Sequence, residues 1–114
     1  MTLIRLPVAP STNNLFANGK HGRFITDHYK AWRTEAGVML NLARVEPFGR
    51  MRVELEILIP EKTRGDISNR VKATEDLLVA HKIIEDDVQV WRLVVGRHKD
   101  ADMLLSIVPF QEHT

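Results

Sequence analysis

The segment RMRVELEILIP at positions 50–60 alternates apolar and charged side chains over most of its length. This period of two residues is typical of a β-strand with one face in a core and the other facing solvent. Arg52, Glu54 and Glu56 occupy the positions predicted to face solvent. Pro60 lacks a backbone N–H and is predicted to end the strand. The side chains predicted to face the core are those of Met51, Val53, Leu55, Ile57 and Ile59.

The remaining segments predict a small α+β domain around this strand. Residues 9–23 are rich in Pro, Ser, Asn and Gly, which predicts a long irregular loop. Two segments with apolar residues at helical spacing predict helices, each with one face on a sheet. The other predicted elements are a strand at 2–8, a helix at about 27–44 capped by Thr26, a helix at about 66–80, and strands at 88–97 and 103–110. We therefore expect a mixed β-sheet with two helices packed on one face, in the order β-α-β-α-β-β.

The buried faces of the two helices follow from the same spacing. In the first helix, Tyr29, Trp32, Ala36, Met39 and Leu40 are predicted to pack on the sheet. In the second, the predicted stripe consists of Ile67, Val71, Thr74 and Leu78. Trp32 and Trp91 are expected in the core or at an interface, because aromatic side chains bury a large area.

Length and composition limit the class of protein. A chain of 114 residues with 44% hydrophobic content is expected to form one domain, spanning 1–114. The absence of cysteine excludes disulfides and thiolate metal ligands. A net charge of +1 argues against a protein that coats nucleic acid by bulk charge, but not against a local basic surface. The sequence shows neither an apolar run of membrane-spanning length nor a secretory signal, so a cytoplasmic protein is expected.

Polar and charged groups are concentrated in the second predicted helix, within GDISNRVKATEDLL at 65–78. Asp66 stands at the helix start, where a carboxylate can cap free N–H groups and oppose the helix dipole. Lys72 and Asp76 are four residues apart, a spacing that favours an ion pair on a solvent-exposed face. Taken alone, this segment is best interpreted as a capped and solvated helix.

A second acidic segment, EDD at 85–87, comes just before the predicted strand at 88–97. An acidic turn is the simpler interpretation. Adjacent aspartates point in different directions, however, so one can bind a metal while the other caps or orients.

Together, the two segments also fit half-sites of a magnesium centre. Magnesium keeps several waters and needs only one or two carboxylates plus a substrate phosphate. Asp66 and a carboxylate of the EDD segment could supply these ligands, and Lys72 could neutralise charge on a cleaved phosphodiester. Lys62, Arg64 and Arg70 flank this region and could hold neighbouring phosphates.

Other common sites find no support in the sequence. The histidines show no HxxxH or HExxH spacing, which argues against zinc. The chain has no GxxxxGK[ST] or GxGxxG segment for nucleotide binding and no GxSxG segment for a serine nucleophile.

The spacing of the two acidic segments resembles that of a known family. DISNRVKATEDLL followed by IIEDDVQV is similar to the paired motifs of the RusA family of Holliday junction resolvases from bacteria and prophages. LPVAPSTNN and EILIPEKTRGD also fit the family, so the resemblance covers essentially the whole chain. It implies a homodimeric, Mg²⁺-dependent endodeoxyribonuclease, with Mn²⁺ as the alternative ion, that binds four-way DNA junctions and makes two symmetric nicks in recombination and repair. Two-fold symmetry suits paired cuts in equivalent strands.

The resemblance also implies roles for individual residues. Asp66, Asn69, Lys72 and the pair Asp86–Asp87 match the motif positions, and Asp87 matches the catalytic aspartate. Asp66 and Asp87 are expected to hold the metal, with Asp86 as a further ligand, while Asn69 orients a ligand or water. The expected DNA contacts are Lys62, Arg64, Arg70, Lys20 and Arg23.

One position departs from the family pattern. Ser68 stands where the family usually has a second aspartate, and a serine hydroxyl is a weaker magnesium ligand than a carboxylate. Ser68 is therefore included among the expected metal ligands. The competing hypothesis is that the protein binds junctions but cuts them weakly. A third hypothesis is a small α+β domain that joins a protein complex and binds no DNA.

Overall fold

A computed structural model describes residues 2–112 and has a four-stranded sheet as its centre. The strands are β1 (Thr2–Leu6), β4 (Val53–Pro60), β5 (Val90–His98) and β6 (Met103–Pro109), in the spatial order β1-β6-β4-β5. β6 is antiparallel to both of its neighbours, whereas β4 and β5 are parallel. The sheet is therefore mixed, as predicted.

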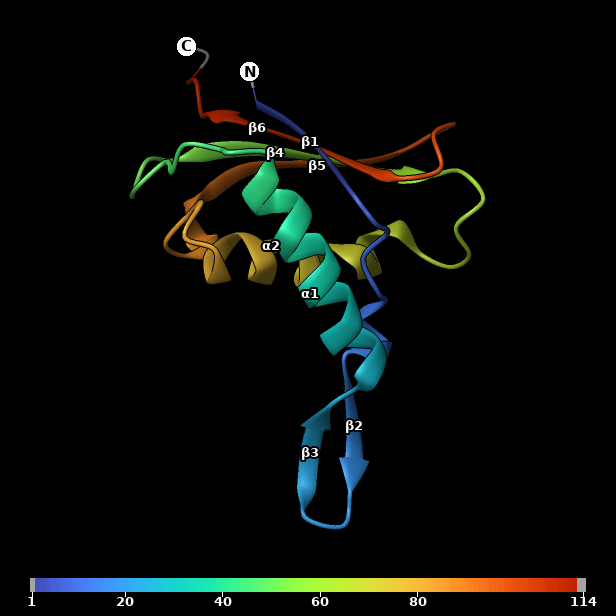
Figure 1. The fold of residues 1–114 in the computed structure, drawn as a ribbon. Helices are drawn as coiled ribbons and strands as arrows, with labels where there is room; N and C mark the ends of the chain where they lie inside the picture. Colours follow the sequence, from blue (N-terminus) through green and yellow to red (C-terminus); the bar gives the residue numbers. More distant parts are fainter. Residues whose placement is uncertain (1, 113–114) are drawn as a thin grey trace.

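Two α-helices lie on the same side of this sheet, α1 (Asp27–Leu42) and α2 (Val71–Ala80) (Figure 1). Thr26 caps α1, because its hydroxyl accepts a hydrogen bond from the backbone N–H of Tyr29 at 3.2 Å. Trp32 lies in the core and donates its indole N–H to the carbonyl of Pro7 at 2.9 Å. The predicted α+β architecture, one compact domain with two helices on one sheet face, is confirmed.

The alternating segment forms the central strand β4, and its inward side chains make up much of the core. Val53, Leu55, Ile57 and Ile59 are each at most 1% exposed. Met51 is the exception to the prediction. It is 51% exposed, because it lies before the first residue of β4 and does not reach the core.

The segment predicted to be an irregular loop, 9–23, contains regular structure, so that prediction is wrong. A 3₁₀ turn, η1 (Thr12–Asn14), is followed by a hairpin of β2 (Phe16–Gly19) and β3 (Gly22–Ile25). The two strands are joined by two residues, and Gly22 has φ +108, which favours glycine. The hairpin projects away from the sheet and helices (Figure 1).

The second predicted helix is divided in two. A 3₁₀ turn, η2 (Ile67–Arg70), leads into α2, and Asp66 caps the turn. Another short turn, η3 (Asp87–Gln89), leads into β5. None of the helices within residues 2–112 is long and apolar enough to cross a membrane.

Candidate active site

Asp66 caps η2, as the sequence predicts, and its carboxylate is exposed. It accepts a hydrogen bond from the backbone N–H of Ser68 at 3.0 Å. Hydrogen bonds from the backbone and side chain of Ser68 lower the pKa of Asp66, and the positive charge of Arg97 lowers it further. Asp66 is therefore ionised at neutral pH, which is the form that binds a cation.

Arg97 fixes the loop that leads to Asp66. Its guanidinium donates hydrogen bonds to three loop carbonyls, those of Glu61 at 3.0 Å, Thr63 at 2.7 Å and Gly65 at 2.9 Å. Sequence reasoning missed Arg97, because it lies at the end of a strand distant in sequence and no local motif marks it. A fork of fixed N–H donors suits this task better than the point charge of a lysine.

Arg70, like Arg97, uses its guanidinium to bind backbone carbonyls, so its side chain does not extend into solvent. It is partly buried and donates to the carbonyl of Ala9 at 2.9 Å and to that of Arg64 at 3.1 Å. Its Nε is buried and has no hydrogen-bond partner within the described part of the chain, residues 2–112. This placement favours a role in holding the loop, whereas the sequence predicted a DNA contact. The side chains of Lys62 and Arg64 are exposed in that loop, and Lys20 and Arg23 are exposed on the hairpin.

Lys72 and Asp76 form the predicted ion pair on α2, with 3.3 Å between the Lys72 Nζ and a carboxylate oxygen of Asp76. The pair lies near Asp87, because α2 packs against η3. Burial, followed by the negative charges of Asp87 and Asp76, raises the pKa of Glu75. Acidic groups therefore gather around Lys72 on this side of α2.

Asp86 and Asp87 interact with each other and have different surroundings. The carboxylate of Asp86 caps η3 by accepting from the backbone N–H of Val88 at 3.1 Å. This bond and one from the Asp87 side chain lower the pKa of Asp86. The same side-chain bond with Asp86, together with burial and the charges of Asp86 and Asp76, raises the pKa of Asp87, while Lys72 lowers it. A bound cation would relieve this crowding of negative charge.

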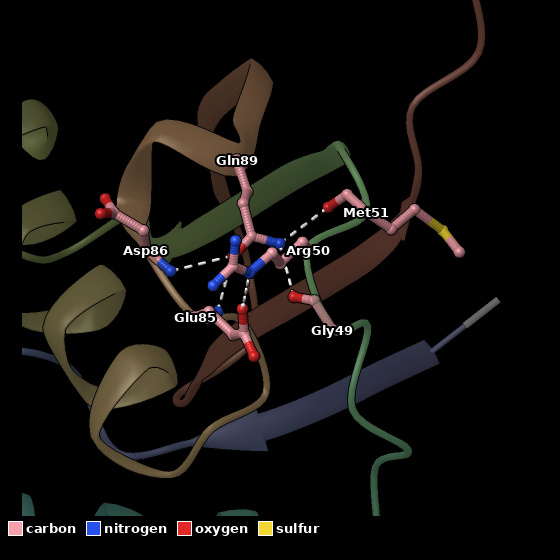
Figure 2. A network of polar contacts seen from close by, with 6 residues as sticks. All are labelled: Gly49, Arg50, Met51, Glu85, Asp86 and Gln89. Atoms are coloured by element: carbon pink, nitrogen blue, oxygen red, sulfur yellow. Dashed lines mark hydrogen bonds and ion pairs between the residues drawn. The ribbon is translucent and has the colours of Figure 1, made fainter.

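Gln89 holds the acidic turn in place, a role that sequence reasoning did not assign. Its Oε1 accepts from the backbone N–H groups of Glu85 at 2.7 Å and Asp86 at 2.9 Å (Figure 2). Its Nε2 donates to the carbonyls of Gly49 at 2.7 Å and Met51 at 2.9 Å (Figure 2). The first two hydrogen bonds close the turn on itself, and the second two join it to the segment before β4, beside an ion pair between Arg50 and Glu85.

Replacing Gln89 by alanine is expected to lower the free energy of unfolding by about 1–3 kcal/mol, because buried backbone groups lose their partners. Urea unfolding monitored by circular dichroism measures this change. Gln111→Ala is the matched control, since Gln111 is exposed. Equal stability of the two variants would contradict the role given to Gln89.

The predicted site residues thus fall into two groups in the structure. Asp66 and Ser68 interact with each other near Arg97, while Lys72 and Asp87 lie together with Asp76. Asn69 links η2 to the N-terminal segment, since its carbonyl accepts from the Thr12 hydroxyl at 2.9 Å.

The donors at these positions suit a hard cation. Among residues 2–112, no three or more His, Asp or Glu side chains are grouped so as to hold one ion by themselves. Magnesium is commonly bound by one or two carboxylates, water and substrate phosphate, and the exposed carboxylates of Asp66 and Asp87 match that donor chemistry. The arrangement therefore fits a metal held partly by the protein and partly by a phosphate.

The fold and the site together define a small α+β protein with an exposed surface of carboxylates and a lysine, groups suited to phosphodiester hydrolysis. The chain matches the family model described as Endodeoxyribonuclease RusA over residues 6–107, and it belongs to the RusA family. This family comprises endodeoxyribonucleases that resolve Holliday junctions, so the chain is of the endodeoxyribonuclease class. A search of curated proteins found no matching relative.

Proposed function

We propose that this protein cuts four-way DNA junctions by Mg²⁺-dependent hydrolysis, with paired symmetric nicks. The observation that carries this proposal, beside family membership, is the position of Lys72 next to Asp76 and Asp87 on an exposed surface. A lysine among carboxylates suits a site where a metal and a phosphate bind together, because each charge then has a partner.

The metal ligands in this proposal come from both groups of residues. Asp66 and Asp87 hold the ion, and the hydrogen bonds with Ser68 lower the pKa of Asp66. When bound, Mg²⁺ or Mn²⁺ lowers the pKa of a water and stabilises charge on the phosphate. Asp86 keeps the turn in shape through its cap and is a further ligand. Asn69 orients a ligand or a water from its place in η2.

Lys72 has a separate role in the proposal. Its ammonium group is exposed on α2 and is paired with Asp76 in the structure. Next to a cleaved phosphodiester, it would place a positive charge beside the oxygens that gain negative charge. Asp76 would then keep the lysine oriented through the observed ion pair.

DNA is held outside this centre by exposed basic side chains. Lys62 and Arg64 lie in the loop fixed by Arg97, immediately before Asp66. Lys20 and Arg23 extend the positive surface onto the hairpin. Such contacts to phosphates position the DNA without reading its sequence.

The activity is tested with a synthetic four-way junction labelled on opposite strands. The wild-type protein is expected to nick both strands at matching positions with Mg²⁺, and to leave a linear duplex of the same sequence intact. Chelation by EDTA is expected to stop nicking while junction binding in a gel-shift assay persists. Equal cleavage of junction and duplex, or nicking that continues in EDTA, would overturn the proposal.

Ser68 supports a second candidate function, a junction-binding protein that cuts weakly. Its backbone and side chain are hydrogen-bonded to Asp66, and a hydroxyl adds no negative charge for a cation. Ser68→Asp is expected to bind Mg²⁺ about tenfold more tightly, a typical effect for groups supporting a metal site. The Mg²⁺ concentration giving half-maximal nicking measures this change, with Ser68→Asn as the uncharged control. An unchanged midpoint would show that a missing carboxylate does not limit the wild type.

We further propose that the protein is a homodimer joined through β5. This strand lies at the end of the sheet order, so one side of its backbone has no neighbouring strand among residues 2–112. It carries exposed apolar side chains, with Trp91 at 54% and Leu93 at 43% exposure. Unpaired strand edges with apolar side chains favour pairing with another chain.

The dimer is tested by replacing Leu93 with glutamate. Because Leu93 is already half-exposed, the folded monomer is expected to tolerate the change, while the dimer is expected to dissociate. Sedimentation velocity separates the two species, and Leu42→Glu is the control, since Leu42 is 75% exposed on α1. A wild-type protein that sediments as a 13.1 kDa monomer would contradict the proposed dimer.

A further inference from the structure

The projecting hairpin has two different faces, fixed by its register. Phe16 pairs with Ile25, Ala17 with Phe24, Asn18 with Arg23, and Gly19 with Gly22. Because side chains alternate along a strand, Phe16, Asn18, Arg23 and Ile25 share one face. On that face Phe16 and Ile25 pack against the core, and the guanidinium of Arg23 lies 4.2 Å from the centre of the Phe16 ring.

The other face of the hairpin is nearly bare. It consists of Ala17, Gly19, Gly22 and Phe24, so Phe24 is its one large side chain. The ring is 51% exposed. A Cβ built on Gly19 would lie 2.8 Å from the Cε1 of Phe24, so the ring depends on the glycine to lie against the strand backbone. Ala17, Gly19 and Gly22 are small, so one side of the Phe24 ring lies on the strand backbone and the other side is open to a ligand.

The charge around this face is positive. Lys20 and His21 are exposed at the turn of the hairpin, whereas Arg23 is exposed on the opposite face. The first 26 residues of the chain contain no aspartate or glutamate. An aromatic ring beside basic groups is the combination with which proteins bind unpaired bases, the ring stacking on the base and the basic groups contacting phosphates.

The base of the hairpin adjoins the candidate active site. Phe16 and Ile25 line a surface hollow together with Asp76, the partner of Lys72. Phe24 is the residue next to Ile25 on the opposite face of the hairpin, so the exposed ring lies beside this hollow and does not line it. A four-way junction differs from a duplex at its branch point, where base stacking is interrupted.

We propose that Phe24 is a stacking platform for an unstacked base at the branch point, with Lys20 and His21 of the adjacent turn holding the adjoining phosphates. This assignment rests on the proposed function and adds a structural basis for choosing junctions over duplexes. Intact duplex has no free base to offer the ring, so Phe24 contributes to junction binding and not to duplex binding.

The test uses the full-length chain, in EDTA to prevent cleavage, and a junction with 2-aminopurine at the branch point. Binding of wild type is expected to change the fluorescence of this base. Phe24→Ala is expected to lose that change and to bind the junction about tenfold more weakly, with unchanged duplex affinity. Phe24→Trp is expected to restore both signals. Leu42→Ala, which removes another exposed apolar side chain, is the control.

The outcomes separate this proposal from the one on which it rests. A wild type that binds junctions while Phe24→Ala binds them equally well overturns the role of Phe24 alone. A wild type that does not bind junctions overturns the proposed function and this inference together. Equal losses of junction and duplex affinity in Phe24→Ala also overturn the role of Phe24. A changed oligomeric mass of Phe24→Ala with unchanged DNA affinity overturns it as well, because the ring would then belong to a protein interface.

Discussion

Replacing Asp87 by asparagine is expected to lower the rate of junction nicking by about a hundredfold or more. The amide has nearly the shape of the carboxylate but lacks its charge, so the proposed metal site loses one of its two main ligands. Junction affinity is expected to stay the same or to rise slightly, because a negative charge has been removed from a surface that faces phosphates. Single-turnover nicking and a gel-shift titration measure the two effects separately.

Glu46→Gln is the matched control for this experiment. Glu46 is exposed and lies between α1 and β4, outside the candidate site, and the change again replaces a carboxylate by an amide. It is expected to nick at the wild-type rate. If Asp87→Asn also nicked both strands at that rate, Asp87 would not be a metal ligand in the reaction.

Replacing Lys72 by alanine is the second change with a large expected effect. The loss of a positive charge beside the cleaved phosphate is expected to lower the nicking rate about a hundredfold to a thousandfold. The free energy of unfolding is expected to change little, because the exposed ion pair with Asp76 contributes at most about 1 kcal/mol to it. Nicking rates at saturating junction concentration, together with urea unfolding, distinguish the chemical role from a structural one.

Two further variants sharpen the test of Lys72. Lys72→Arg keeps the charge and is expected to retain more activity than alanine, whereas Lys30→Ala removes an exposed lysine from α1 and is expected to be neutral. If Lys72→Ala lost junction affinity but kept its nicking rate at saturation, the lysine would bind DNA without assisting the reaction.

The sequence predicted those parts of the fold that depend on regular periodicity. The alternation in β4 identified four of its core residues correctly, and the helical spacing located α1 with its cap at Thr26. The prediction for Met51 was wrong because the apolar and charged alternation begins before the first residue of β4. The hairpin was missed because its strands are only four residues each and contain glycine, so composition alone indicated a loop.

For the candidate site, the local features were predictable and the long-range contacts were not. The cap at Asp66 and the ion pair between Lys72 and Asp76 follow from residue type and spacing, and both are present. The contacts of Arg97 with the loop at 61–65 join segments more than thirty residues apart, as do those of Gln89 with Gly49 and Met51. No local sequence pattern predicts such contacts, because they form only when β4 and β5 are paired.

We propose that Asp66 and Asp87, from two separate turns, hold one metal ion where the junction is cut. A crystal structure of the protein with junction DNA and Mn²⁺, with anomalous scattering used to locate the ion, tests this most directly. We predict an anomalous peak within about 2.0–2.2 Å of a carboxylate oxygen of each aspartate and next to a DNA phosphate. A peak that contacts neither Asp66 nor Asp87 would show that these aspartates do not hold the ion.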